Sequence, residues 1–142
     1  MASKTYLVPV DFSQGSEAAL NSALRIAKEH HGKLLLLHVV STAFTFPLET
    51  GFAEVFDALE KNARQSMAKL IKRKRLKPRQ CRSLVVTGVN AADVIAAAAK
   101  KSRAAMIIMG SHGKTGWQRF LLGSTAERTL RYAQCPVLIV KK

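Results

Sequence analysis

The sequence predicts an α/β protein with a doubly wound, open five-stranded parallel sheet and helices on both faces of that sheet. Two observations lead to this prediction. Short apolar runs alternate with longer segments in which apolar residues recur at helical spacing. The runs are apolar on both sides of the predicted strand, as in Leu34–Val40, which is typical of parallel strands buried between helices. Because connections between parallel strands are right-handed, such a sheet is doubly wound.

The individual elements follow from the apolar pattern. The predicted strands are Tyr6–Val10, Leu34–Val40, Leu84–Thr87, Met106–Met109 and Pro136–Val140. The longest predicted helix carries an apolar face from Val55 to Ile71, and it follows a predicted loop over residues 41–52. Five strands and four helices therefore alternate along the chain.

Capping residues mark where the helices begin. Ser13 is placed to cap the first helix, which ends before Gly32, and Asn90 is placed to cap the third. The fourth helix opens at Ser124, the first residue of an S-x-x-E sequence that ends at Glu127. This spacing predicts a capping box, in which Ser124 and Glu127 satisfy each other's backbone N–H groups.

Length and composition indicate one globular domain over residues 1–142. The hydrophobic content is 48% and the mean hydropathy is +0.03. No apolar run reaches the ~18–20 residues of a membrane span, and the first residues show no signal-peptide pattern, so we expect a cytoplasmic protein. Cys81 and Cys135 form no metal-binding spacing and are predicted to be reduced thiols.

The charge is strongly basic and unevenly distributed. The chain has 23 basic and 9 acidic residues, which gives a net charge of +14. Residues 1–60 carry 4 basic against 7 acidic residues, so nearly all of the excess lies in residues 61–142. The stretch Lys69–Arg82 contains eight cations and no acid. It predicts either a polyanion-binding surface or a solvated basic helix end.

A glycine-rich segment is the strongest indication of function. Gly110 and Gly113 directly follow a predicted strand, and Gly123 and Ser124 precede a predicted helix. A strand that leads through such a loop to a helix N-terminus presents backbone N–H groups to an anion, which suits a phosphate. The alternative is that the glycines serve only as turns and Ser124 only as a cap. The spacing matches neither a Walker A loop nor a dinucleotide fingerprint.

Asp11 ends the first predicted strand, and strand ends in such sheets face the ligand crevice. Its carboxylate is predicted either to bind an adenine or ribose group or to support the helix cap at Ser13. His112 lies inside the glycine-rich segment and faces either phosphate or solvent, whereas His38 reads as a core histidine. No pattern typical of a catalytic nucleophile, base or metal site appears in the sequence.

The sequence resembles the universal stress protein family over essentially its whole length. The resemblance rests on Pro9–Ser13, Leu37–Val39, Cys135–Val140 and above all the pattern G-x2-G-x9-G-[ST] from Gly110 to Ser124. That pattern is typical of the ATP-binding branch of the family. The resemblance implies a Rossmann-like sheet with strand order 3-2-1-4-5, and a homodimer formed by pairing of the last strands, here Val137–Val140.

The resemblance also implies a set of nucleotide-binding residues. Those implied near adenine and ribose are Pro9, Val10, Asp11 and Val39, and those implied near ribose and phosphates are Met109, Gly110, His112, Gly113, Gly123, Ser124 and Thr125. The function so predicted is an ATP-binding stress-response protein that acts as a nucleotide-responsive switch or interaction module. Two alternatives stay open: slow ATP hydrolysis with Mg²⁺ held mostly by the phosphates, and polyanion binding through Lys69–Arg82.

Overall fold

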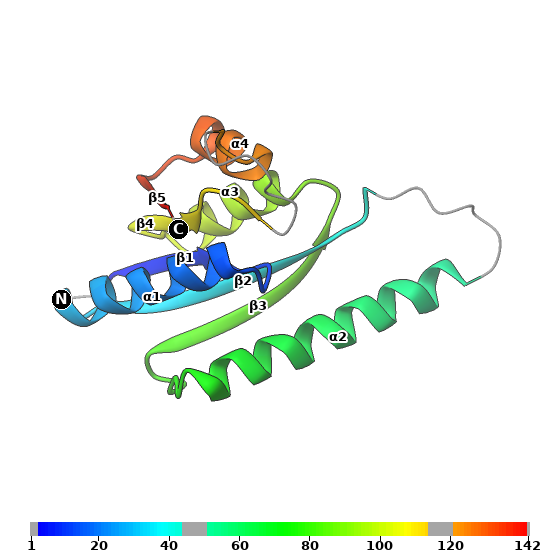
Figure 1. Ribbon diagram of the computed structural model, residues 1–142, viewed down its shortest axis with the longest axis horizontal. Coiled ribbons are helices and arrows are strands. Elements are labelled where there is room, and N and C mark those ends of the chain that lie inside the picture. Colours follow the sequence, from blue (N-terminus) through cyan, green and yellow to red (C-terminus); the bar gives the residue numbers. More distant parts are fainter. Residues whose placement is uncertain (1–2, 44–50, 114–120, 142) are drawn as a thin grey trace.

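The computed structural model describes residues 3–43, 51–113 and 121–141. Strands and helices alternate through these residues (Figure 1). In chain order the elements are β1 (Thr5–Pro9), α1 (Gln14–Glu29), β2 (Lys33–Ser41), α2 (Phe52–Arg73), β3 (Cys81–Gly88), α3 (Ala91–Lys101), β4 (Met106–Gly110), α4 (Ser124–Tyr132) and β5 (Val137–Val140).

The strands form one parallel five-stranded sheet in the order β3-β2-β1-β4-β5, which confirms the predicted fold class. The register is set by pairs such as Leu7 with Leu35 of β2 and Leu7 with Ile107 of β4. The sheet order reverses between β1 and β4, because β2 follows β1 on one side and β4 lies on the other. This is the point at which ligands bind in doubly wound sheets.

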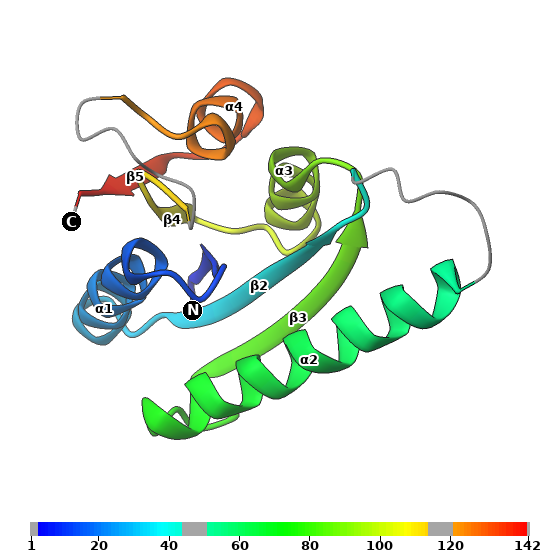
Figure 2. The ribbon, with the colours of Figure 1, turned by 45° about the vertical axis from the view of Figure 1, so that its right-hand side comes forward.

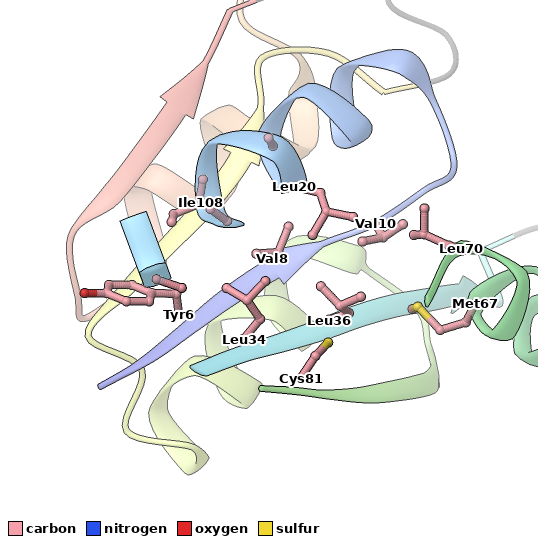
Figure 3. Close-up of a cluster of buried hydrophobic side chains, with 13 residues drawn as sticks. Tyr6, Val8, Val10, Leu20, Leu34, Leu36, Met67, Leu70, Cys81 and Ile108 are labelled. Carbon is pink, nitrogen blue, oxygen red and sulfur yellow. The ribbon is translucent and has the colours of Figure 1, made fainter. Parts of the chain in front are cut away.

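Each face of the sheet has its own apolar core. On one face α1 and α2 cover side chains that include Val8, Leu36 and Ile108, and Figure 3 shows Met67 and Leu70 of α2 beside them. On the other face Leu7 and Ile107 pack in a cluster with residues of α3 and α4. Figure 2 shows the two pairs of helices on opposite sides of the strands. Alternate residues of β1 therefore enter different cores, which is why the strand is apolar at every position.

Helix caps explain where the first and third helices begin. Ser13 Oγ accepts the backbone N–H of Ser16, and Asn90 Oδ1 accepts those of Ala92 and Asp93, so both predicted caps are confirmed. Among the described helices, none is both long and apolar enough to cross a membrane.

Most predicted strand boundaries differ from the structure by one residue, and the third strand and the second helix differ by more. The third strand begins at Cys81, three residues before Leu84, because residues from Cys81 onward pair with β2 although Arg82 and Ser83 are exposed and polar. The second helix begins at Phe52, inside the predicted loop, and residues 44–50 of that loop lie outside the described residues. The last strand begins at Val137 and not at Pro136.

Candidate functional site

A cavity of about 580 Å³ lies at the carboxyl ends of β1, β2 and β4, between the first residues of α3 and α4. Its volume is in the range of ligand pockets. All of the residues predicted for a nucleotide site line it, namely Pro9, Val10, Asp11, Val39, Met109, Gly110, His112, Gly113, Gly123, Ser124 and Thr125. The fold thus brings together residues that are more than 100 positions apart in the sequence.

Asp11 is held in place by the turn between β1 and α1. Its Oδ1 accepts hydrogen bonds from the backbone N–H of Ser13, at 3.0 Å, and from the Ser13 hydroxyl. Ser13, not Asp11, caps the helix, so Asp11 supports the cap while its carboxylate also lines the cavity. Phe12 between them has a φ of 63°, a left-handed conformation that costs on the order of 1 kcal/mol in a residue other than glycine. Its ring packs on His38, with 4.8 Å between the ring centroids.

Each of the three loop glycines lies so close to another part of the protein that a Cβ would not fit. Gly113 lies against a side chain, and Gly110 and Gly123 lie against backbone. A Cβ at Gly113 would lie 2.6 Å from Oδ2 of Asp11, and a Cβ at Gly110 would lie 2.8 Å from the backbone of Gly15 in α1. A Cβ at Gly123 would lie 2.9 Å from the carbonyl oxygen of Ser111. None of the three loop glycines has a positive φ. These contacts show that glycine is needed at all three positions for close packing within the protein, a requirement that the sequence pattern did not predict.

The predicted capping box at α4 is wrong as well. Gly123 is the N-cap and has no side chain that could cap the helix, and among the described residues no side-chain cap bond is found there. Ser124 is the first helical residue, and the Glu127 carboxylate accepts a hydrogen bond from Arg131 at 3.1 Å. Because Ser124 is already helical, its hydroxyl is not placed as an N-cap acceptor would be. The first turn of α4 lines the cavity and carries the positive end of the helix dipole, and no side chain of the described residues caps its backbone donors.

Two histidines border the cavity in different states of hydrogen bonding. His38 Nδ1 lies 2.6 Å from the carbonyl oxygen of Val10, and since a carbonyl can only accept, Nδ1 carries the proton. His38 is half-buried and lines the cavity, so it is more than the core histidine that the sequence predicts. His112 bonds through Nδ1 to the Ser111 hydroxyl at 3.0 Å. Its Nε2 is buried and has no hydrogen-bond partner in the described part of the chain.

The sequence did not single out the apolar wall of the cavity or Ser16 and Ser111. The further lining residues are Ser16, Leu37, Ala91, Ile95, Ser111, Leu121, Leu122 and Ala126. Ser16 Oγ accepts the backbone N–H of Asp11 at 3.4 Å, which ties α1 to the end of β1. Apolar side chains of α3 such as Ile95 give no indication of a binding role in the sequence. The one available signal is the spacing of four residues from Ala91 to Ile95, which predicts that both lie on one face of the helix.

A metal ion would need ligands beyond those that this part of the protein brings together. Within residues 3–43, 51–113 and 121–141, no group of three or more His, Cys, Asp or Glu side chains is arranged to hold one.

The Cys81 thiol is buried, and burial raises its pKa to about 11; burial also raises the pKa of Cys135. Both thiols are therefore protonated near neutral pH.

The chain is an α/β protein whose open, doubly wound sheet has a cavity at the reversal of strand order, the place where ligands bind in sheets of this class. The chain belongs to the universal stress protein family, whose model matches residues 3–141. It is 34% identical to the universal stress protein MJ0531 of Methanocaldococcus jannaschii over 98% of this chain and 82% of that protein.

Solved structures are similar over the whole chain. The structure of protein MJ0577 from the same archaeon superposes with a TM-score of 0.87 at 30% identity, covering 100% of this chain and 98% of that one. The universal stress protein UspA of Lactobacillus plantarum gives a TM-score of 0.84 at 27% identity, covering 99% of each chain. The fold and the family are thus established by both sequence and structure.

Proposed function

We propose that the chain binds an adenine nucleotide, ATP, in the cavity and acts as a nucleotide-responsive module in the stress response. The first turn of α4 is the observation that carries the proposal. It opens on the cavity without a side-chain cap, beside the Ser124 and Thr125 hydroxyls and the half-buried His112. Uncapped backbone donors and a helix dipole favour an anionic ligand at this end of the cavity.

The rest of the cavity fits the other parts of the nucleotide. Val10, Val39 and Leu37 offer an apolar surface for a base, and the Asp11 carboxylate at the end of β1 can accept hydrogen bonds from ribose hydroxyls. The buried, unpartnered Nε2 of His112 is a group that a phosphate oxygen could satisfy. A Mg²⁺ ion, where one accompanies ATP, would be held mainly by the phosphates. The universal stress protein family supports the stress-response role.

A charge-changing variant separates phosphate binding from damage to the fold. Ser124→Asp places a carboxylate in the first turn of α4, where the helix dipole favours a negative charge, so the variant should be at least as stable as the wild type. Repulsion should lower ATP affinity by at least tenfold and leave adenosine affinity unchanged. Calorimetry with ATP and adenosine measures both, and Ser83→Asp on β3 is a matched control. Equal ATP affinity in wild type and Ser124→Asp would refute the phosphate position.

The nucleotide content of the purified protein is the first measurement to make. The protein is denatured, and the supernatant is separated by ion-exchange chromatography with mass detection. We expect ATP or ADP near one per chain, or uptake of added ATP by an empty protein. Phosphate release by wild type, Asp11→Ala and Gly113→Ala tests the alternative of slow hydrolysis. A protein that is empty and takes up no ATP would contradict the proposal.

We further propose a homodimer that pairs β5 with its symmetry mate. β5 is an edge strand whose residues pair only with β4 in the described sheet, and Leu138 is 37% exposed on it. An apolar edge strand is better paired than left open. Light scattering on the eluted protein should give twice the chain mass of 15.6 kDa, and Leu138→Lys should shift it to the monomer mass. A wild-type monomer at micromolar concentration would contradict this proposal.

A further inference from the structure

A row of cations lies at the end of the sheet where the strands begin, which is the end opposite the cavity. Lys4 directly precedes β1, Lys33 begins β2, and Arg79 and Arg103 lie shortly before β3 and β4. Backbone hydrogen bonds align these positions: Lys33 N–H donates to the Lys4 carbonyl at 2.7 Å. Leu34 N–H donates to Gln80, and Ala105 N–H to Thr5, both at 2.8 Å. With neighbouring strands ~4.8 Å apart, the row spans about 15 Å.

Three helices end at this same edge and add further cations. Lys28 lies in the last turn of α1, Lys72 in that of α2, and Lys100 and Lys101 in that of α3, and all four are exposed. Figure 1 shows the start of β1, the end of α1 and the turn from α2 to β3 toward the left-hand end of the sheet. We call the exposed cations of the row and of these helix ends the basic face. Glu29 is the sole acid in the described turns that build this face.

The second residue after each of these helices is an arginine or a histidine, at a position where glycine is favoured. His31, Arg75 and Arg103 have φ values of 52°, 55° and 52°, in the left-handed region. The backbone around Arg75 and Arg103 forms the Schellman pattern, with Leu76 N–H donating to Ile71 and Ala104 N–H to Ala99. That position usually holds glycine. Two arginines held in this backbone conformation at one end of the sheet indicate that their charge serves a purpose other than stability.

Helix dipoles do not account for the basic face. One cation in the last turn of a helix complements its dipole, but Lys4, Lys33 and Arg79 lie in or shortly before strands and belong to the last turn of no described helix. Among the described residues, no carboxylate lies within 4.0 Å of the row cations, since the ion pairs found involve other residues. The row therefore presents unneutralised positive charge to solvent.

The structure also divides the basic stretch Lys69–Arg82 that the sequence singled out. Arg73 and Lys74 form ion pairs with Glu17 of α1, at 2.6 and 3.0 Å. Lys69 borders a separate cavity of about 210 Å³ beside Ser13. Of this stretch, Lys72 and the cations from Arg75 to Arg79 join the basic face. A polyanion would thus meet residues of four chain segments and not one helix.

We propose that the basic face binds double-stranded nucleic acid through its phosphates, without reading sequence. About 15 Å of duplex carries roughly nine phosphate charges, which matches a row of this length. A membrane surface is a poorer fit, because the exposed large apolar side chains toward this end, such as Leu130 and Tyr132 near the end of α4, are fewer than the cations of the basic face, whereas a membrane-surface helix needs a broad apolar face. Single strands are a poorer fit, because Tyr132 near the end of α4 is the one exposed aromatic ring of the described chain toward this end of the sheet, and stacking of successive bases needs several rings. The proposal is independent of nucleotide binding, which lies at the opposite edge.

Fluorescence anisotropy with the full chain and two 25-base-pair duplexes of unrelated sequence tests the proposal. Near physiological salt we expect micromolar affinity, equal for both duplexes. With about six phosphate contacts, the affinity should fall roughly a thousandfold between 50 and 200 mM NaCl. A sequence preference above tenfold, or an affinity that does not change with salt, would overturn the proposal.

The left-handed arginines allow a variant that does not threaten the fold. Arg75→Gly combined with Arg103→Gly relieves backbone strain, so the melting temperature should not fall, while duplex affinity should fall at least tenfold and the salt slope by about 2. The matched control, Lys61→Gln with Arg64→Gln, removes two charges from the middle of α2 and should lose less than threefold. Equal losses in both pairs would show that net charge, and not the basic face, binds the duplex. Tighter binding to vesicles with 30% phosphatidylserine than to duplex, at equal phosphate, would favour a membrane and overturn the proposal.

Discussion

Gly113→Ala tests whether the glycine loop and Asp11 are mechanically coupled. The new Cβ would lie 2.6 Å from Asp11 Oδ2, about 0.8 Å short of the 3.4 Å at which ordinary contacts begin. A shift of the carboxylate by that distance would lengthen the 3.0 Å bond from Ser13 N–H beyond hydrogen-bonding range. A hydrogen bond to a charged group contributes about 1.5 kcal/mol or more. The gain of about 0.5 kcal/mol from a stiffer unfolded chain offsets part of this loss.

We therefore expect Gly113→Ala to lower the free energy of unfolding by about 1 kcal/mol. Urea denaturation monitored by circular dichroism measures that change. The decisive control repeats the substitution in an Asp11→Ala background, where the carboxylate is gone and Gly113→Ala should be neutral or slightly stabilising. An equal loss of stability in both backgrounds would show that Asp11 is not the group displaced, and it would refute the reasoning.

Three further predictions follow from the same structure. Gly110→Ala should destabilise the protein more than Gly113→Ala, by about 2–3 kcal/mol in urea denaturation, because its Cβ meets the backbone of Gly15 and not a movable side chain. Glu17→Gln should lower the free energy of unfolding by on the order of 1 kcal/mol at pH 7, because solvent screens this exposed ion pair. Arg73 and Lys74 lower the Glu17 pKa from 4.5 to about 2, so the stabilisation is present above pH 4.5 and is lost as the pH falls toward 2. A difference between wild type and variant that persists at pH 2 would contradict this. At pH 7.5 Cys135 should react with a thiol reagent before the buried Cys81. In urea both thiols should react rapidly, because unfolding exposes them. An immediate reaction of Cys81 in the native protein would contradict its burial.

The fold was largely predictable because its main determinants are local. Parallel strands buried on both faces must be apolar at successive positions, and Leu34–Leu37 has that pattern before any contact is known. Ser13 and Asn90 have the side chains that cap helices and lie at the predicted helix starts. The edge strand β3 was predicted less well, since one side of an edge strand is solvated and its first residues need not be apolar.

The capping box predicted at α4 does not form, because a tertiary contact, and not the local sequence pattern, sets where this helix begins. The sequence Ser124–Glu127 fits the box, but Gly123 N–H donates to the Ser111 carbonyl at 2.7 Å, and this contact from the loop fixes the helix start one residue earlier. Similarly, the need for glycine at Gly110 depends on Gly15, a partner 95 positions away, whose approach no spacing rule reveals.

The sequence by itself determined the order of the elements, the type of sheet and the residues at the strand ends. These depend on periodicity and on local hydrogen-bonding side chains, which are properties of short windows of the chain. Only the tertiary structure decided what those residues do to one another. It set Asp11 against Gly113, left the first turn of α4 without a side-chain cap, and gathered cations from four segments at the opposite edge. Such features depend on which distant segments the packing brings into contact, and a linear pattern does not carry that information.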